Sequence, residues 1–207
     1  MLDILRENVL TLLQNPTSLL ALFGVLILIA AAIQARHVKL STRILVNVSL
    51  LLALATVLHF LRLYHFPQGG SVTLGAMIPL LMISFRYGAG VGTLAGFAFG
   101  LITILQDPFI VHPVQVLFDY PLPYMSAGLA GIFPQRKVFA TILAFAGRFA
   151  CHFVAGVIFF ASYAPEGTSP IIYSLTVNAM LLVPEALICC AILKFLPVER
   201  LLAAMKD

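Results

Sequence analysis

The sequence TSLLALFGVLILIAAAIQA, residues 17–35, contains no charged side chain and has the length of one membrane-spanning helix. A helix needs about 20 consecutive apolar residues to cross the hydrocarbon core of a bilayer. Outward from this run, further apolar runs follow along the rest of the chain. They lie at residues 43–63, 72–86, 88–106, 114–133, 138–163 and 170–196. The run at 72–86 is short for a full span, so the sequence predicts six or seven crossings.

The composition supports the same conclusion. Hydrophobic residues make up 61% of the 207 residues, the mean hydropathy is +1.06, and charged residues contribute only 10%. A soluble domain carries about 25% charged residues, so this chain cannot cover a water-facing surface. We therefore predict an all-α fold, a polytopic membrane helix bundle with almost no soluble part.

Basic residues are distributed unevenly between the loops. If every run crosses the bilayer, one side holds Arg36, Lys39, Arg43, Arg86, Arg136, Lys137, Lys194, Arg200 and Lys206. The loops on the other side hold only Arg6 and Arg62. Cytoplasmic loops carry an excess of Lys and Arg, so the C-terminus is predicted to be cytoplasmic and the N-terminus outside. The net charge of +4 is then explained by loop charge, and no nucleic-acid partner is expected.

Sequence motifs for nucleotide binding and catalysis are missing. Glycines at a spacing of four, Gly88, Gly92, Gly96 and Gly100, predict a close-packing face on one helix. No lysine follows them, so the phosphate-binding pattern GxxxxGK[ST] is absent. Neither a GxSxG elbow nor an HExxH zinc motif occurs, and the cysteines show no metal-ligand spacing. We expect no catalytic activity, no cofactor and no metal site.

Ionisable side chains inside the apolar runs are the candidates for function, because they are costly in a membrane. They are His59, Asp119, Arg148, His152 and Glu185. Asp119 is the most informative, since Pro121 and Pro123 follow it and each removes a helix hydrogen-bond donor. Irregular backbone at membrane depth is tolerated where it lines a cavity, so Asp119 is predicted to point into one. The alternative is a structural ion pair between Asp119 and Arg148 or another helix.

Two later runs add groups that can surround a planar molecule. His152, Gly156 and Phe160 are spaced by four and share a helix face. Gly156 leaves space for a planar ring, and Phe160 offers a flat apolar wall beside it. The same spacing is also compatible with simple helix packing. Tyr173 and Asn178 lie on the last run, with Tyr173 near its outer end. Together these residues predict an aromatic pocket with one negative charge, suited to a planar, cationic or amine-bearing small molecule.

Several segments, in order and without large gaps over about residues 43–196, resemble one family. They are residues 70–79, 112–120, 148–153 and 156–167. They are similar to the thiamine-binding S component, the substrate-capture subunit, of energy-coupling factor (ECF) transporters. The resemblance implies a bacterial plasma-membrane bundle of six core helices that binds thiamine on its extracellular side. It also implies docking onto a transmembrane coupling subunit and two ATPase subunits.

By comparison with this six-helix family pattern, residues 43–207 are predicted to form the six-helix substrate-binding domain. Residues 1–42 are predicted to form an extra N-terminal transmembrane helix and a cytoplasmic linker. The substrate-binding residues implied by the resemblance are Asp119, Tyr120, His152, Gly156, Phe160, Tyr173 and Asn178. Phe160 stands where one member of the family has a tryptophan, and the chain contains no tryptophan, so the stacking surface is expected to be weaker.

The docking surface is predicted on the run at 43–63. Ser49 and Ala53 have the small-xxx-small spacing that lets helices approach closely, and the family docks through small residues on the corresponding helix. The alternative is that the pair packs within the bundle itself. Two rival functions remain: capture of a different vitamin on the same scaffold, or an unrelated membrane enzyme or channel.

Overall fold

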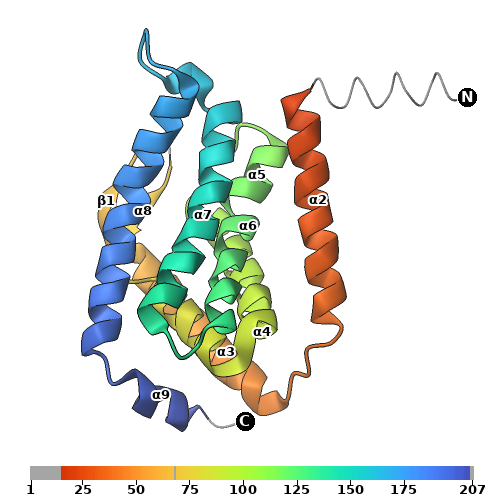
Figure 1. Cartoon of the computed structure of the whole chain (residues 1–207), viewed down its shortest axis with the longest axis vertical. Coiled ribbons are helices and arrows are strands. Elements are labelled where there is room, and N and C mark those ends of the chain that lie inside the picture. Colours follow the sequence, from red (N-terminus) through yellow and green to blue (C-terminus); the bar gives the residue numbers. More distant parts are fainter. Residues whose placement is uncertain (1–14, 68, 206–207) are drawn as a thin grey trace, which may run out of the picture.

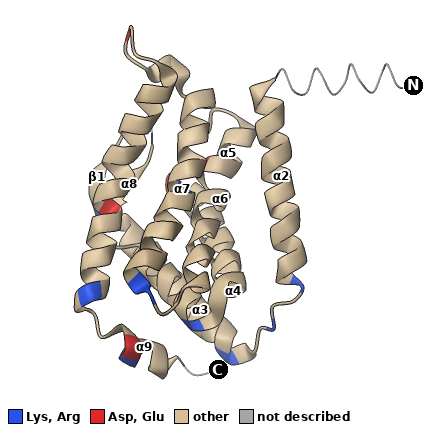
Figure 2. Ribbon diagram, in the orientation of Figure 1, with Lys and Arg blue, Asp and Glu red and all other residues tan. Residues whose placement is uncertain are grey.

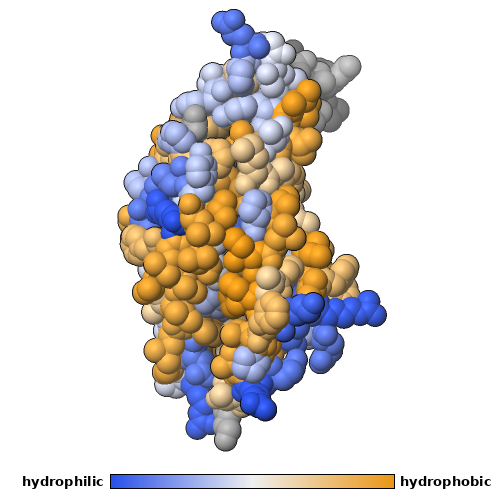
Figure 3. Space-filling view, turned by 90° about the vertical axis from the view of Figure 1, so that its left-hand side faces the viewer, coloured by the Kyte–Doolittle hydropathy of each residue, from blue (hydrophilic) through white to orange (hydrophobic). Residues whose placement is uncertain are grey.

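Most of the chain forms long apolar helices, as the sequence predicts. The computed structural model describes residues 15–67 and 69–205. Within them, the helices long and apolar enough to cross a membrane are α2 (Pro16–Ala35), α3 (Thr42–Phe60), α4 (Met77–Gln106), α7 (Lys137–Phe159) and α8 (Pro170–Phe195). In Figure 1, α2, α7 and α8 run roughly upright and α3 runs obliquely behind them, and large apolar side chains cover much of the face seen in Figure 3. The predicted class, a helical membrane protein, is confirmed, whereas the number of crossings stays a prediction.

Hydrogen bonds from backbone N–H groups to polar side chains fix where three of these helices begin. Asn15 accepts the backbone N–H groups of Thr17 and Ser18 at the start of α2, and Ser41 accepts that of Ile44 in α3. Ser169 does the same for Ile171 in α8. Such caps satisfy donors that have no partner inside the helix, which matters most where water is scarce.

The predicted runs at 72–86 and 88–106 are joined by a sharp turn at Gly88 rather than by a loop. Gly88 has φ of +83° and ψ of 178° in the middle of α4, a conformation open mainly to glycine. A Cβ atom on Gly92 would lie 2.1 Å from the Ser84 hydroxyl oxygen, although residues eight apart in a straight helix are about 12 Å apart along its axis. The chain therefore reverses at Gly88, which is a turn residue and not part of the predicted glycine face.

The predicted run at 114–133 has the irregular backbone that Pro121 and Pro123 indicate. It consists of α5 (Pro113–Asp119), α6 (Pro121–Met125) and the 3-10 helix η1 (Ser126–Ile132). The break falls at Tyr120, whose φ and ψ are −122° and −82°, directly before the two prolines. Gly96 and Gly100 of α4 press against this segment, since a Cβ on Gly96 would lie 2.1 Å from the Tyr124 carbonyl oxygen.

A short hairpin lies between α3 and α4, where the sequence predicts the beginning of a span. Strand β1 (Arg62–His65) pairs antiparallel with β2 (Ser71–Thr73), and β2 is buried along its whole length. In Figure 1 the hairpin lies beside α8 at about mid-height. Non-helical backbone at this depth is stable where protein surrounds it or a cavity adjoins it.

Two short helices complete the fold. The 3-10 helix η2 (Ala161–Tyr163) follows α7, and α9 (Val198–Ala204) follows α8. Val198 and Leu202 of α9 are buried, while Glu199 forms an ion pair with Lys137 at 3.1 Å. Helix α9 therefore lies across one end of the bundle, as Figure 1 shows.

Most of the Lys and Arg positions coloured in Figure 2 lie at that same end of the molecule. This is the distribution that the positive-inside rule requires if the end faces the cytoplasm. Arg6 and Lys206, which also entered the topology argument, lie outside the described residues. The orientation itself stays a prediction.

Helix α2 packs beside α5 at the edge of the bundle (Figure 1). Gly24 faces the ring of Phe118, where an added Cβ would lie 2.9 Å away, and Leu20 belongs to the same apolar cluster. Of all the residues in α2, only Leu20 and Gly24 are buried. The exposed residues of the helix are thus available to lipid.

Candidate functional site

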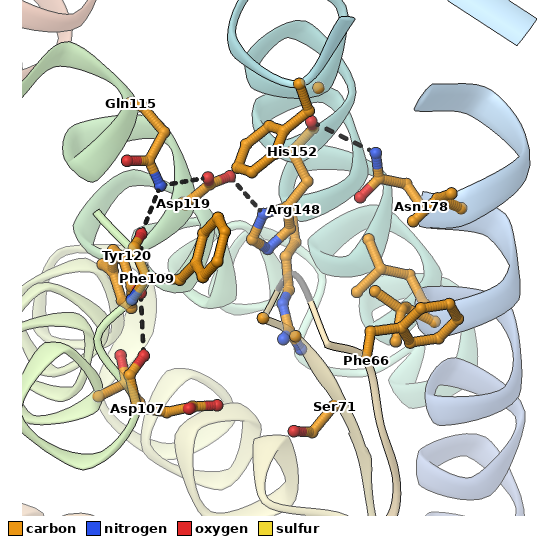
Figure 4. Close-up of a pocket in the computed structure, with 18 of the residues that line it drawn as sticks. Phe66, Ser71, Asp107, Phe109, Gln115, Asp119, Tyr120, Arg148, His152 and Asn178 are labelled. Atoms are coloured by element: carbon orange, nitrogen blue, oxygen red, sulfur yellow. Dashed lines mark hydrogen bonds and ion pairs between the residues drawn. The ribbon is translucent and has the colours of Figure 1, made fainter. Parts of the chain in front are cut away.

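One cavity brings together every predicted substrate-binding residue. It lies between the β1–β2 hairpin, the segment that joins α4 to α5, and helices α5, α7 and α8 (Figure 4). The predicted residues that line it are Asp119, Tyr120, His152, Gly156, Phe160, Tyr173 and Asn178. The sequence places them on three separate apolar runs, so only the packing of the helices unites them.

Asp119 lies at the C-terminal end of α5, where the chain breaks before Pro121. One carboxylate oxygen is 3.0 Å from His152 Nδ1 on α7, and the other accepts a 2.7 Å hydrogen bond from the Gln115 side-chain amide. The Asp119 side chain is 16% exposed. The carboxylate is therefore oriented by two neighbours and still reachable from the cavity.

Arg148 does not pair with Asp119, although Asp119 does contact another helix through His152, so only the Arg148 half of the structural alternative is contradicted. The Arg148 guanidinium lies 2.8 Å from the Glu185 carboxylate on α8, and both side chains are almost fully buried. Glu185 also accepts a 2.5 Å hydrogen bond from the hydroxyl of Thr73 on β2. The guanidinium further lies 4.7 Å from the centre of the Tyr124 ring. This ion pair links α7, α8 and the hairpin next to the cavity.

The charges around the cavity leave one carboxylate without a basic Lys or Arg partner. Asp107, the other acidic residue in the cavity lining, is 3.1 Å from the Arg62 guanidinium. Arg148 is neutralised by Glu185. Among the described lining residues, Asp119 thus supplies the negative charge, balanced only if His152 is protonated. With a neutral histidine, the cavity favours a cation.

Aromatic rings form the walls of the cavity. Phe160 and Phe109 are stacked, with ring centres 5.9 Å apart and planes tilted by 24°, and Phe66 and Tyr173 also line the cavity. The volume of the cavity, about 120 Å³, is below the roughly 300–1,000 Å³ of ligand pockets. A planar ligand therefore has to displace side chains in order to bind. If the stacked rings of Phe160 and Phe109 separate, each ring presents one face to the ligand.

Tyr120 and Gln115 hold the segment that carries Phe109. The Tyr120 hydroxyl accepts a 2.6 Å hydrogen bond from the Phe109 backbone N–H and donates to the Asp107 carbonyl at 2.9 Å. The Gln115 amide donates to the Phe109 carbonyl as well as to Asp119. Figure 4 shows this chain of contacts. Gln115 therefore holds both this wall and the carboxylate, and Tyr120 holds the wall.

Gly156 permits the close approach of α7 and α8. An added Cβ would lie 2.2 Å from the Ser174 hydroxyl oxygen and 3.3 Å from the Asn178 amide nitrogen. That nitrogen donates to the backbone carbonyl of His152 at 3.3 Å and to that of Ser174 at 2.9 Å. The Asn178 side-chain oxygen remains on the cavity side in Figure 4, where it can accept a hydrogen bond.

Sequence reasoning missed three contributors to this site: Phe66, Phe109 and Gln115. Phe66 and Phe109 lie next to Pro67 and Pro108, in segments where the sequence predicts only turns between the membrane spans. Gln115 precedes Asp119 by four positions on one helix, so the i, i+4 spacing was a usable signal. No group of His, Cys, Asp or Glu that could hold a metal ion occurs in the described part of the chain.

Fold and cavity define a class: a polytopic helical membrane protein with a small-molecule cavity enclosed by its helices. The family model "Thiamine transporter protein" matches residues 45–204. The chain therefore belongs to the thiamine transporter family, and the resemblance found in the sequence is confirmed. A family of transporters also fits the expectation that the chain is not an enzyme.

Relatives with curated descriptions agree. The chain is 36% identical to thiamine transporter ThiT of Bacillus subtilis over 183 residues, which span 78% of this chain and 95% of the relative. It is 31% identical to thiamine transporter ThiT of Lacticaseibacillus paracasei over 49% of this chain and 61% of that protein. A solved structure of ThiT from Listeria monocytogenes superimposes with a TM-score of 0.68 at 25% identity, covering 76% of this chain and 93% of that one.

Proposed function

We propose that this protein captures thiamine as the S component of an ECF transporter in the bacterial plasma membrane. The observation that carries the proposal is Asp119, a carboxylate in an aromatic-lined cavity with no Lys or Arg partner among the described residues. Family membership supports the same ligand. The end of the bundle rich in Lys and Arg faces the cytoplasm in this proposal, with the C-terminus on that side.

The chemistry of thiamine matches the groups around the cavity. Thiamine has a permanent positive charge on its thiazolium ring and an aminopyrimidine that donates hydrogen bonds. Asp119 supplies the counter-charge, and the Asn178 oxygen supplies an acceptor. The Phe160 and Phe109 rings supply stacking and cation–π surfaces, worth about 0.5–2 kcal/mol per contact. Anionic biotin finds no matching unpaired cation among the described lining residues.

The ligand assignment is tested by titration calorimetry on the purified protein. We expect thiamine to bind with a Kd at or below about 1 μM, which corresponds to roughly 8 kcal/mol. Riboflavin and biotin serve as competitors in the same assay. Equal or tighter binding of either vitamin would refute thiamine capture.

The chain has no nucleotide-binding motif, so we propose that a coupling subunit and two ATPase subunits drive uptake. Liposomes that contain only this protein are expected to bind labelled thiamine without accumulating it. Adding ATP inside or outside leaves that result unchanged. ATP-driven accumulation by this chain alone would contradict the proposed dependence on partners.

Ser49 and Ala53 are the proposed docking residues for the coupling subunit. Both are exposed on α3, next to Leu50 at 65% and Val57 at 60% exposure. Packing within the bundle therefore does not account for their small size. Exposed small residues let the backbone of a partner helix approach closely.

Ala53→Trp is expected to abolish co-purification with the coupling subunit and to leave thiamine affinity within about threefold, less than 1 kcal/mol. The indole ring blocks the close approach but lies outside the cavity lining. Leu187→Trp is the matched control, because Leu187 is 66% exposed on α8. Co-purification of the Ala53→Trp protein at the wild-type yield would place the docking surface elsewhere.

A further inference from the structure

A second cavity lies at the Lys- and Arg-rich end of the bundle, about 490 Å³ in volume. Half of its wall comes from the segment that ends α2 and leads to α3, with Gln34, His37 and Lys39. The other half comes from the turn within α4, with Arg86, Tyr87 and Gly90. The family match begins only at residue 45, so this cavity is shared between the family domain and the chain segment that precedes it.

Close packing joins the two halves of this cavity. A Cβ on Gly90 would lie 2.8 Å from the Val38 side chain, so the linker rests directly on the turn. The Asn47 amide donates a 2.8 Å hydrogen bond to the Tyr87 hydroxyl, which ties α3 to the same place. The cavity is thus a fixed feature of how the α2–α3 linker meets α4.

The lining is basic and contains no acidic residue among its described members. Lys39 is exposed at the rim, beside His37. Arg86 uses its Nε to donate to the Met205 carbonyl at 2.6 Å and lies over the Tyr87 ring. A phosphate group is an anion that the Lys39 ammonium and the His37 ring N–H fit.

The position of the cavity places it at the depth of lipid headgroups. Ile29 and Ile33 near the end of α2 are about half exposed, as are Leu45 and Val46 near the start of α3, so both helix ends face hydrocarbon. The linker between them turns back into the polar layer. Val38, Ile44 and Val91 add an apolar side to the cavity, which an acyl chain can contact while the phosphate meets Lys39.

We propose that this cavity binds the phosphate headgroup of an anionic phospholipid from the adjoining leaflet. The ligand class is a phosphodiester lipid with a net negative charge, and Lys39 is its principal counter-charge. Basic pockets between membrane helices bind such headgroups through attraction to Lys and Arg near the surface. The bound lipid would fix α2 and its linker against the family domain.

Native mass spectrometry of the full chain, titrated with phosphatidylglycerol or with phosphatidylcholine of the same acyl chains, tests this proposal. We expect the first phosphatidylglycerol to bind the wild-type protein more tightly than the first phosphatidylcholine. Lys39→Gln should weaken that phosphatidylglycerol by about fivefold and Lys39→Glu by about thirtyfold, one and two units of charge. Lys194→Glu, at the same end but outside the cavity, should leave it unchanged.

Two further measurements keep the outcome decisive. Thiamine titration of each variant reports correct folding, because Lys39 does not line the first cavity. Inorganic phosphate in excess separates a lipid site from a soluble-anion site. Any of three results would overturn the lipid assignment. The wild-type protein could bind both lipids equally, or bind phosphatidylglycerol no more tightly than Lys39→Gln does. Alternatively, inorganic phosphate could displace the bound phosphatidylglycerol completely.

Discussion

Asp119→Asn is expected to weaken thiamine binding by about 30-fold or more while the protein stays folded. Two unit charges about 4 Å apart attract by roughly 4 kcal/mol at an effective dielectric near 20, and desolvation of both groups removes part of this. Truncating one partner of a buried charged pair typically costs about 2–5 kcal/mol. Asparagine keeps the shape and still accepts from Gln115, so the substitution removes mainly the charge.

Phe160→Ala is the comparison variant for this prediction. Stacking and cation–π contacts are worth about 0.5–2 kcal/mol, so its effect should be smaller than that of Asp119→Asn. Calorimetric titration of both variants, with a melting curve for each empty protein, gives the order. A folded Asp119→Asn protein that binds thiamine within about threefold of wild type, less than 1 kcal/mol, would rule out the charge-pairing mechanism.

Glu185→Gln is expected to lower the free energy of unfolding of the empty protein by about 3–5 kcal/mol, the cost of removing one partner of a buried ion pair. Glu185 is 1% exposed and lies 2.8 Å from Arg148. The substitution leaves the guanidinium buried and uncompensated between α7 and α8. It also weakens the hydrogen bond from Thr73 that holds the hairpin.

Thermal melting in detergent measures this effect. The double variant Arg148→Met/Glu185→Gln serves as the control, because it removes the orphaned charge and should recover part of the loss. Glu185→Asp, which keeps the charge, should fall between wild type and Glu185→Gln. A Glu185→Gln protein that melts at the wild-type temperature would show that the ion pair does not stabilise the bundle.

The two acidic residues thus have different roles that their sequence context does not separate. Asp119 and Glu185 both lie in apolar runs, and both are costly there. Asp119 contacts a histidine and an amide and remains partly exposed to the cavity. Glu185 contacts an arginine and a hydroxyl and is sealed from it. Asp119→Asn should therefore lower thiamine affinity with little loss of stability. Glu185→Gln should lower stability with little change in thiamine affinity.

The sequence alone determined the class and much of the helix placement. Runs such as 17–35 and 170–196 predicted α2 and α8 to within a residue or two, because length and hydropathy are local properties that the bilayer constrains directly. The prolines after Asp119 marked a break, and α5 ends at Asp119. The cost of burying charge singled out Asp119 and His152 as candidates, and all the predicted substrate-binding residues line one cavity. Their part in thiamine binding stays a prediction.

Only the tertiary structure decided which of these residues meet. Arg148 and Glu185 are 37 positions apart, and Thr73 and Glu185 are 112 apart. Helical spacing relates side chains three or four positions apart on one helix. It does not predict which side chains on different helices come into contact. The same holds for Phe109, which reaches the cavity because Tyr120 and Gln115 anchor its segment, and for the reversal at Gly88. This bundle has little polar surface, so the few long-range hydrogen bonds and ion pairs determine how the helices pack. The reason is that each unpaired polar group in the apolar interior costs several kcal/mol.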